Sequence, residues 1–220
     1  MQNKKNFLKK GFTLVETIVA IALFTVGTQA TVILFAKIMR SKAYSMEMGK
    51  SAFVVSRSMG DLTQYLRRTR QSDVGLYPIV TADDNDLVFY SDYDKNGKTE
   101  RLHIYFADGA DADANADTIY MGVREPSGTF PVTYASGDGE IITLAEHIVN
   151  TPSDPVFSYY NKDYPGDLAH NPVATPAVVS EIRLVKIFLK INIDPNNAPD
   201  NIQQETFVEL RNLNDYDRIY

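Results

Sequence analysis

The chain has 220 residues and no cysteine, so disulfides, thiolate nucleophiles and cysteine-ligated metal sites are excluded. Its 22 basic and 28 acidic side chains give a net charge of −6, which disfavours nonspecific binding to nucleic acid or to an anionic membrane surface. No nucleic-acid partner is therefore expected. The chain beyond the N-terminal region is long enough for one domain of about 150 residues with its own core.

An apolar stretch at residues 12–36 follows a basic start and contains one carboxylate, Glu16. A bilayer core needs roughly 20 apolar residues of helix, so this stretch predicts a transmembrane helix. The basic start favours a cytoplasmic N-terminus by the positive-inside rule, although three basic residues at 37–42 weaken the asymmetry. Glu16 either reaches water near the headgroups, as in an ordinary anchor, or meets a dedicated partner.

Two ordinary interpretations compete for this N-terminus. A secretory signal has an apolar core of about 7 to 15 residues and a small-residue cleavage site, and the run here is too long, with only a weak site at residues 28–30. A permanent signal anchor fits the length. A signal anchor does not explain why the sequence Gly11-Phe12-Thr13-Leu14-Val15-Glu16 stands at the start of the membrane-spanning stretch.

Helical periodicity continues beyond the apolar stretch, because Val55, Met59, Leu62 and Leu66 fall at i, i+4, i+7 and i+11. The first proline is Pro78, so one helix is predicted from residue 12 to about residue 71. A basic cluster near its end is expected to be a solvated helix end and not a site for DNA or lipid. The cluster consists of Arg67, Arg68 and Arg70.

From residue 76 onward, short apolar runs alternate with turns, which predicts an antiparallel sheet. The candidate strands are residues 87–90, 101–106, 118–123, 141–149, 156–160, 181–193 and 206–211. Asn96-Gly97 between the first two is a strong hairpin signal. The polar or proline-rich connections at 107–117, 150–155, 161–176 and 195–202 are predicted to be loops.

The turn at residues 92–100 has acidic side chains at alternate positions before a glycine, as in the first half of a calcium loop. The candidate ligands are Asp92, Asp94, Asn96, the Lys98 carbonyl and Glu100. The second half fails, because His103 stands where such a loop needs a glutamate. A plain hairpin turn is the simpler interpretation and a weak calcium site the alternative, so calcium is a candidate ligand and no cofactor is required.

A second run has the same alternate spacing without the glycine and is expected to be a solvated acidic loop. It consists of Asp111, Asp113, Asn115 and Asp117. Catalytic motifs are absent from the sequence: His103, His147 and His170 lie far apart without metal-ligand spacing, and there is no phosphate-binding glycine loop. No enzyme activity is predicted.

The run Lys10-Gly11-Phe12-Thr13-Leu14-Val15-Glu16 before an apolar helix resembles the N-terminus of type IV prepilins and of the pseudopilins of type II secretion. In that family a prepilin peptidase cuts after the glycine and methylates the new amino terminus, which a neighbouring subunit's glutamate then meets. The resemblance implies that Gly11 ends the leader, Phe12 is the methylated first residue and Glu16 is the assembly carboxylate. It implies as partners the prepilin peptidase, other pilins or pseudopilins, and an inner-membrane assembly platform.

The later part of the chain resembles the J-type minor pseudopilins more diffusely, through the turn at 92–101, Tyr105, the apolar run at 182–193 and residues 210–213. Glu16 argues against the K-type tip pseudopilin, which typically lacks this carboxylate. Many type IV pilins close a C-terminal loop with a disulfide, and this cysteine-free chain departs from them.

Together these features predict an α+β, pilin-like fold with a long N-terminal transmembrane helix packed on an antiparallel β-sheet head. The predicted segments are a basic leader at 1–11, a transmembrane helix at 12–36, its amphipathic continuation at 37–71 and a β-rich extracytoplasmic head at 72–220. The predicted function is that of a minor pilin or pseudopilin, a structural subunit of a type IV pilus or of a filament like that of type II secretion. The alternative is a monomeric, membrane-tethered binding module such as an adhesin or DNA-uptake receptor, and a secreted hydrolase comes third.

Overall fold

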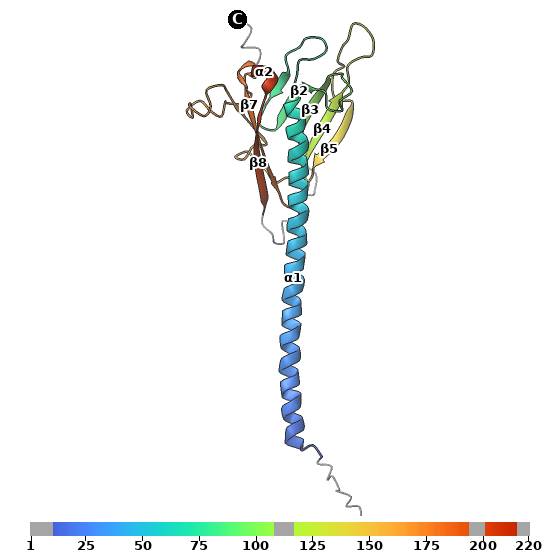
Figure 1. Ribbon diagram of the computed structural model, residues 1–220, viewed down its shortest axis with the longest axis vertical. Helices are drawn as coiled ribbons and strands as arrows, with labels where there is room; N and C mark the ends of the chain where they lie inside the picture. Colours follow the sequence, from blue (N-terminus) through green and yellow to red (C-terminus); the bar gives the residue numbers. More distant parts are fainter. Residues whose placement is uncertain (1–10, 108–116, 194–200, 215–220) are drawn as a thin grey trace, which may run out of the picture. The chain divides into compact units, whose positions relative to one another are not determined.

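The computed structural model describes residues 11–107, 117–193 and 201–214. The chain forms two compact units, Met1–Met46 and Glu47–Tyr220. The long helix α1 (Leu14–Arg67) begins in the first unit and ends in the second, which also contains all the strands (Figure 1). An apolar N-terminal helix with antiparallel sheets confirms the predicted α+β, pilin-like fold class.

The part of α1 in the first unit is apolar from Thr17 to Ala36 apart from a few uncharged polar residues, and its described side chains are all exposed. Within the described residues, α1 is the one helix long and apolar enough to cross a membrane. Threonine hydroxyls in this part of α1 make hydrogen bonds within the helix: Thr28 and Thr31 each donate at 2.9 Å to the carbonyl four residues earlier. A helix with its polar groups paired internally suits a hydrocarbon environment.

The part of α1 in the second unit buries one face, which carries Ser51, Val55, Ser58, Met59, Leu62 and Leu66. These positions include the four that the sequence periodicity predicts for one face. The helix ends at Arg67, earlier than the predicted residue 71, because Thr69 already pairs with Ser91 as an isolated antiparallel bridge.

Two antiparallel sheets form the rest of the second unit. The first has the order β1-β2-β3-β4-β5 and consists of Ile79–Ala82, Asp86–Ser91, Glu100–Ala107, Thr118–Arg124 and Glu140–Ala145. The second has the order β6-β7-β8 and consists of Phe157–Tyr160, Leu184–Ile191 and Ile202–Glu209. A 3₁₀ turn, η1 (Val179–Glu181), precedes β7, and a short helix, α2 (Arg211–Asn214), follows β8.

Four strands, β1, β5, β7 and β8, differ most from the sequence prediction. The four-residue strand β1 was not predicted, and β7 begins three residues late because residues 179–181 form η1. Strand β5 ends at Ala145, and His147 beyond it adopts a φ of 60°, which an extended strand does not accommodate. Strand β8 begins at Ile202 because it pairs with β7 through a largely exposed, polar stretch that carries no apolar pattern.

One hydrophobic core joins α1 to both sheets, with Leu62 from the helix, Phe89 and Leu102 from the first sheet, and Tyr159 and Ile187 from the second. The buried Tyr159 hydroxyl donates to the Asp83 carbonyl at 2.8 Å and so is satisfied within the core. Strands β2 and β3 pair without a register shift, from Asp86↔Tyr105 to Ser91↔Glu100. The turn between them is therefore held at a fixed place at the edge of the core.

Candidate functional site

The residues of the predicted processing site lie at the start of the described chain. Gly11 and Phe12 precede α1, and the Phe12 side chain is 86% exposed. Thr13 follows them and is the last residue before the helix. The predicted scissile bond between Gly11 and Phe12 therefore lies outside the helix, between exposed residues.

Glu16 takes part in a capping arrangement at the beginning of α1. The Thr13 backbone N–H donates to Glu16 Oε2 at 3.3 Å, and the Glu16 backbone N–H donates to the Thr13 hydroxyl at 3.3 Å. This reciprocal pair is the capping box that the pattern Thr-x-x-Glu favours. This capping box was not predicted, although the residues Thr13 and Glu16 carry its pattern in the sequence. Glu16 thus has a local structural role beside any role in assembly.

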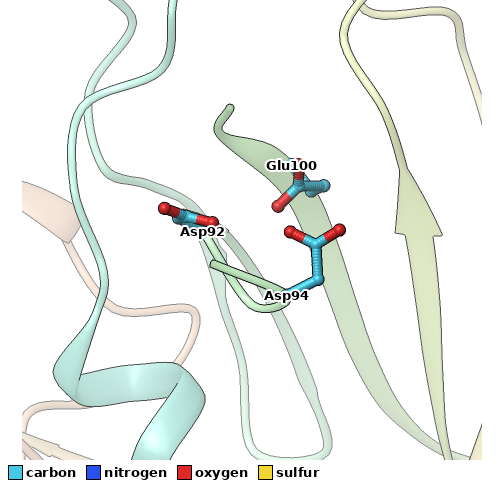
Figure 2. Close-up of side chains that lie close together, drawn as sticks. All are labelled: Asp92, Asp94 and Glu100. Carbon is cyan, nitrogen blue, oxygen red and sulfur yellow. The ribbon is translucent and has the colours of Figure 1, made fainter. Parts of the chain in front are cut away.

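A second candidate site lies in the turn between β2 and β3, where three carboxylates converge. Asp92 and Asp94 belong to the turn, and Glu100 is the first residue of β3. One carboxylate oxygen from each lies within 4.8 Å of the others, and Figure 2 shows the three groups facing a common space. Within the described part of the chain, this is the one set of acidic or histidine side chains arranged closely enough to hold a metal ion.

Glu100 is the buried member of this carboxylate cluster, with a relative exposure of 0%. Its Oε2 accepts a hydrogen bond from the Tyr93 backbone N–H at 3.3 Å, while its Oε1 has no hydrogen-bond partner. Asp92 Oδ1 is likewise buried without a partner. Burial, followed by the nearby charge of Asp94, raises the pKa of Glu100 from 4.5 to about 7.

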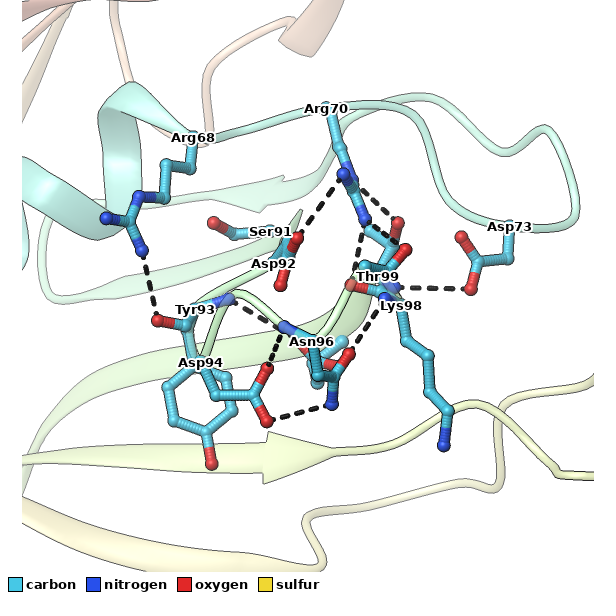
Figure 3. Close-up of polar contacts among 12 residues, drawn as sticks. Arg68, Arg70, Asp73, Ser91, Asp92, Tyr93, Asp94, Asn96, Lys98 and Thr99 are labelled. Carbon is cyan, nitrogen blue, oxygen red and sulfur yellow. Dashed lines mark hydrogen bonds and ion pairs between the residues drawn. The ribbon is translucent and has the colours of Figure 1, made fainter.

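The other two predicted calcium ligands do not face the cluster. The Asn96 side chain donates from Nδ2 to Asp94 Oδ2 at 2.8 Å, and its Oδ1 accepts from the Lys98 backbone N–H at 2.8 Å. The Lys98 carbonyl accepts from Arg70 at 2.8 Å (Figure 3). Asp92, Asp94 and Glu100 are therefore brought together, although both Asp94 oxygens also accept hydrogen bonds from Asn96. The oxygens of Asn96 and Lys98 are used within the turn and do not face the other two carboxylates.

Two arginines hold this turn from the end of α1. Arg68 donates to the Tyr93 carbonyl at 3.2 Å. Arg70 donates to the Thr99 hydroxyl and to the Gly97 carbonyl, at 2.8 and 3.0 Å, and its Nη1 lies 3.5 Å from Asp92 Oδ2 (Figure 3). The expectation of a solvated basic cluster is therefore wrong for Arg68 and Arg70. The groups in the turn that these arginines contact lie more than twenty residues further along the sequence. Helix periodicity cannot predict contacts over such a separation.

The histidines do not form a joint site. His103 Nδ1 lies 2.8 Å from Asp138 Oδ2, and its Nε2 lies 2.9 Å from Asp86 Oδ2, so the ring bridges two carboxylates at the surface of the first sheet. Neither contact was predicted, because both partners are distant in sequence. Three of the four residues of the second acidic run, 111, 113 and 115, lie outside the described residues.

Comparison with known proteins gives one match. A family model of the prokaryotic N-terminal methylation motif matches residues 7–28. This motif is the hallmark of type IV prepilin-like proteins, and here it covers the residues just before α1 and the first turns of α1. No curated protein and no solved structure gives a significant match. The match supports a type IV pilin- or pseudopilin-type protein anchored by one membrane-spanning helix.

Proposed function

We propose that this chain is a minor pilin or pseudopilin, a non-enzymatic structural subunit of a type IV pilus or of a filament like that of type II secretion. The observation that carries the proposal is the methylation motif at residues 7–28, followed by the exposed apolar part of α1. An apolar helix whose described side chains are exposed is suited first to the bilayer and then to packing with other such helices. The predicted processing residues, Gly11 and Phe12, precede this helix.

In this proposal the prepilin peptidase removes residues 1–11 and methylates Phe12. The N-terminus faces the cytoplasm before processing, and the head lies outside the cytoplasm. Removal of four leader lysines leaves 18 basic and 28 acidic side chains, a net charge of −10. The partners are other pilins or pseudopilins and the inner-membrane assembly platform.

Mass spectrometry of the mature N-terminus tests the processing step. The expected mature chain begins at a methylated Phe12. Gly11→Val should block cleavage because the peptidase must approach the backbone closely there, whereas Gly11→Ala, the smaller change, should retain more processing. An intact Met1 or a mature chain that begins at residue 31 would refute the proposal.

The role of Glu16 is tested by separating its charge from its capping hydrogen bonds. Glu16→Gln removes the charge, yet glutamine also serves in a capping box. Thr13→Ala removes the capping hydroxyl and keeps the charge. Glu16→Leu removes both. If Glu16 is an assembly carboxylate, the Glu16→Gln and Glu16→Leu proteins should lose their partner pilins, whereas the Thr13→Ala protein should retain them.

The measurement is recovery of partner pilins with the protein from detergent-solubilised membranes at equal expression. Removing one member of a buried ion pair costs about 3 to 5 kcal/mol, so the loss of partners should be large. Insertion and cleavage at Gly11 should survive all three changes. Equal recovery for wild type, Glu16→Gln and Glu16→Leu would favour the tethered binding module instead.

A further inference from the structure

We propose that Asp92, Asp94 and Glu100 bind one calcium ion in the turn between β2 and β3. Three carboxylate oxygens lie within 4.8 Å of one another, a spacing that one cation at 2.3 to 2.6 Å from each can bridge with small adjustments. The site is separate from the N-terminal motif, and it does not depend on the proposed function.

Two buried oxygens in this cluster favour a cation as their partner. Glu100 is completely buried, and its Oε1 has no hydrogen-bond partner. Asp92 Oδ1 is also buried and has no hydrogen-bond partner. A buried carboxylate oxygen that faces neither a cation nor a donor is unfavourable, even where the other oxygen of the same group is paired. A cation between these oxygens removes that penalty at both atoms at once, whereas a proton on Glu100 satisfies only one of them.

The charge of the cluster matches a divalent ion. Three carboxylates carry three negative charges, and Arg70 lies 3.5 Å from Asp92 Oδ2 and offsets one of them. Two negative charges remain. The donors are all oxygens, which Ca²⁺ and Mg²⁺ prefer over softer metals. Calcium accepts six to eight oxygens in an irregular arrangement, whereas magnesium demands a near-ideal octahedron, so three carboxylates without octahedral order fit calcium better.

The turn is already held in shape by contacts outside the three carboxylates, while both Asp94 oxygens accept hydrogen bonds from Asn96 that a bound ion would share or replace. Arg70 donates to the Gly97 and Lys98 carbonyls. On the other side the Tyr134 hydroxyl donates to the Thr99 carbonyl at 2.7 Å, and the Thr99 backbone N–H donates to Asp73 Oδ2 at 3.2 Å. A preorganised site loses little ordering entropy when the ligand binds.

The experiment uses the full-length protein, purified in detergent and stripped of metals with a chelator that is then removed. Terbium is the first probe, because it takes calcium sites and its luminescence is excited through nearby tyrosines; Tyr93 lies in this turn. Calcium should displace terbium. Thermal unfolding with calcium, magnesium or neither is the second measurement, at ligand concentrations up to about 10 mM, because extracellular calcium modules bind at about 10⁻⁴ to 10⁻³ M.

At a calcium concentration ten times the dissociation constant, the folding equilibrium constant should rise about tenfold. This corresponds to an increase of about 3 to 6 °C in the melting temperature. Glu100→Gln, which keeps the side-chain shape, should abolish both the terbium signal and the calcium shift. Asp163→Asn makes the same charge change at an exposed residue outside the turn and should respond like wild type.

Asp94 is exposed, so Asp94→Asn gives a second test if Glu100→Gln does not fold. It should weaken calcium binding at least tenfold. Absence of both terbium luminescence and a calcium shift in wild type would leave a protonated Glu100 in a plain hairpin turn and overturn the proposal. An unchanged response in Glu100→Gln would also overturn it. An equal shift with magnesium would overturn the assignment to calcium.

Discussion

Ionisation of Glu100 is expected to destabilise the metal-free protein as the pH rises. Burial, and then the charges of Asp94 and Asp92, raise the pKa of Glu100 from 4.5 to about 7, while a hydrogen bond from the Tyr93 backbone acts in the opposite direction. A raised pKa means that the folded state binds the proton more tightly than the unfolded state. The stabilisation that protonated Glu100 contributes to the folded state is therefore fully present below pH 4.5, and it is lost as the pH rises from 4.5 to about 7.

The size of this effect follows from the shift and from the surroundings of the cluster. Each pKa unit corresponds to about 1.4 kcal/mol, and the exposed Asp94 and the partly exposed Arg70 allow water to screen the charges, so the expected loss is on the order of 2 kcal/mol. Arg70 faces Asp92 and not the unpartnered oxygen of Glu100, so it does not remove the loss.

The assay is denaturant unfolding of the metal-free protein in detergent at pH 5 and pH 8, followed by tyrosine fluorescence or near-ultraviolet circular dichroism. Glu100→Gln mimics the protonated side chain and should be less destabilised than wild type on going from pH 5 to pH 8. Comparing the two proteins cancels the contributions of the other titrating groups. Identical pH dependence in the two proteins would refute the reasoning, because Glu100 would then ionise alike in both states.

Three further substitutions test the frame around the site. Arg70→Lys keeps the charge but loses the fork of donors to three groups of the turn, and should lower the unfolding free energy by about 1 to 2 kcal/mol in chemical denaturation. Gly122→Ala should cost about 1 to 3 kcal/mol, because the new methyl group overlaps the Asp138 side chain, and should shift the His103 ring resonances in NMR. Leu62→Ala removes a fully buried side chain and should cost about 2 to 5 kcal/mol, measured as a lower denaturation midpoint.

Periodic and local patterns were sufficient for most of the secondary structure. The apolar stretch and the buried face of α1 follow a 3.6-residue period, and β2 and β3 flank an Asn-Gly turn, so both could be read from residues close in sequence. The first half of strand β8 could not be predicted in this way. Its residues form a strand because they pair with β7, and their own composition does not indicate one. The same limit applies to β1, which has only four residues.

The candidate calcium site was predictable in its ligand types but not in its geometry. Alternate acidic residues before a glycine predicted Asp92 and Asp94, and the spacing added Glu100. The burial of Glu100 and the engagement of Lys98 by Arg70 depend on contacts across the fold. Sequence spacing therefore overestimated the number of available ligands, since it cannot show which oxygens are already used by the turn itself.

Glu16 and Glu100 show how one residue type acquires different requirements from its surroundings. Glu100 is buried by its own chain, so its negative charge must be neutralised within the head, either by a bound proton or by a bound cation. Glu16 is exposed in its own unit, and its contacts with Thr13 are long hydrogen bonds of 3.3 to 3.4 Å. Those contacts suffice in water but not in hydrocarbon, because a desolvated carboxylate needs a countercharge. The apolar helix around Glu16 supplies none before Lys37, so in the proposed assembly the countercharge comes from the terminal amine of a neighbouring subunit.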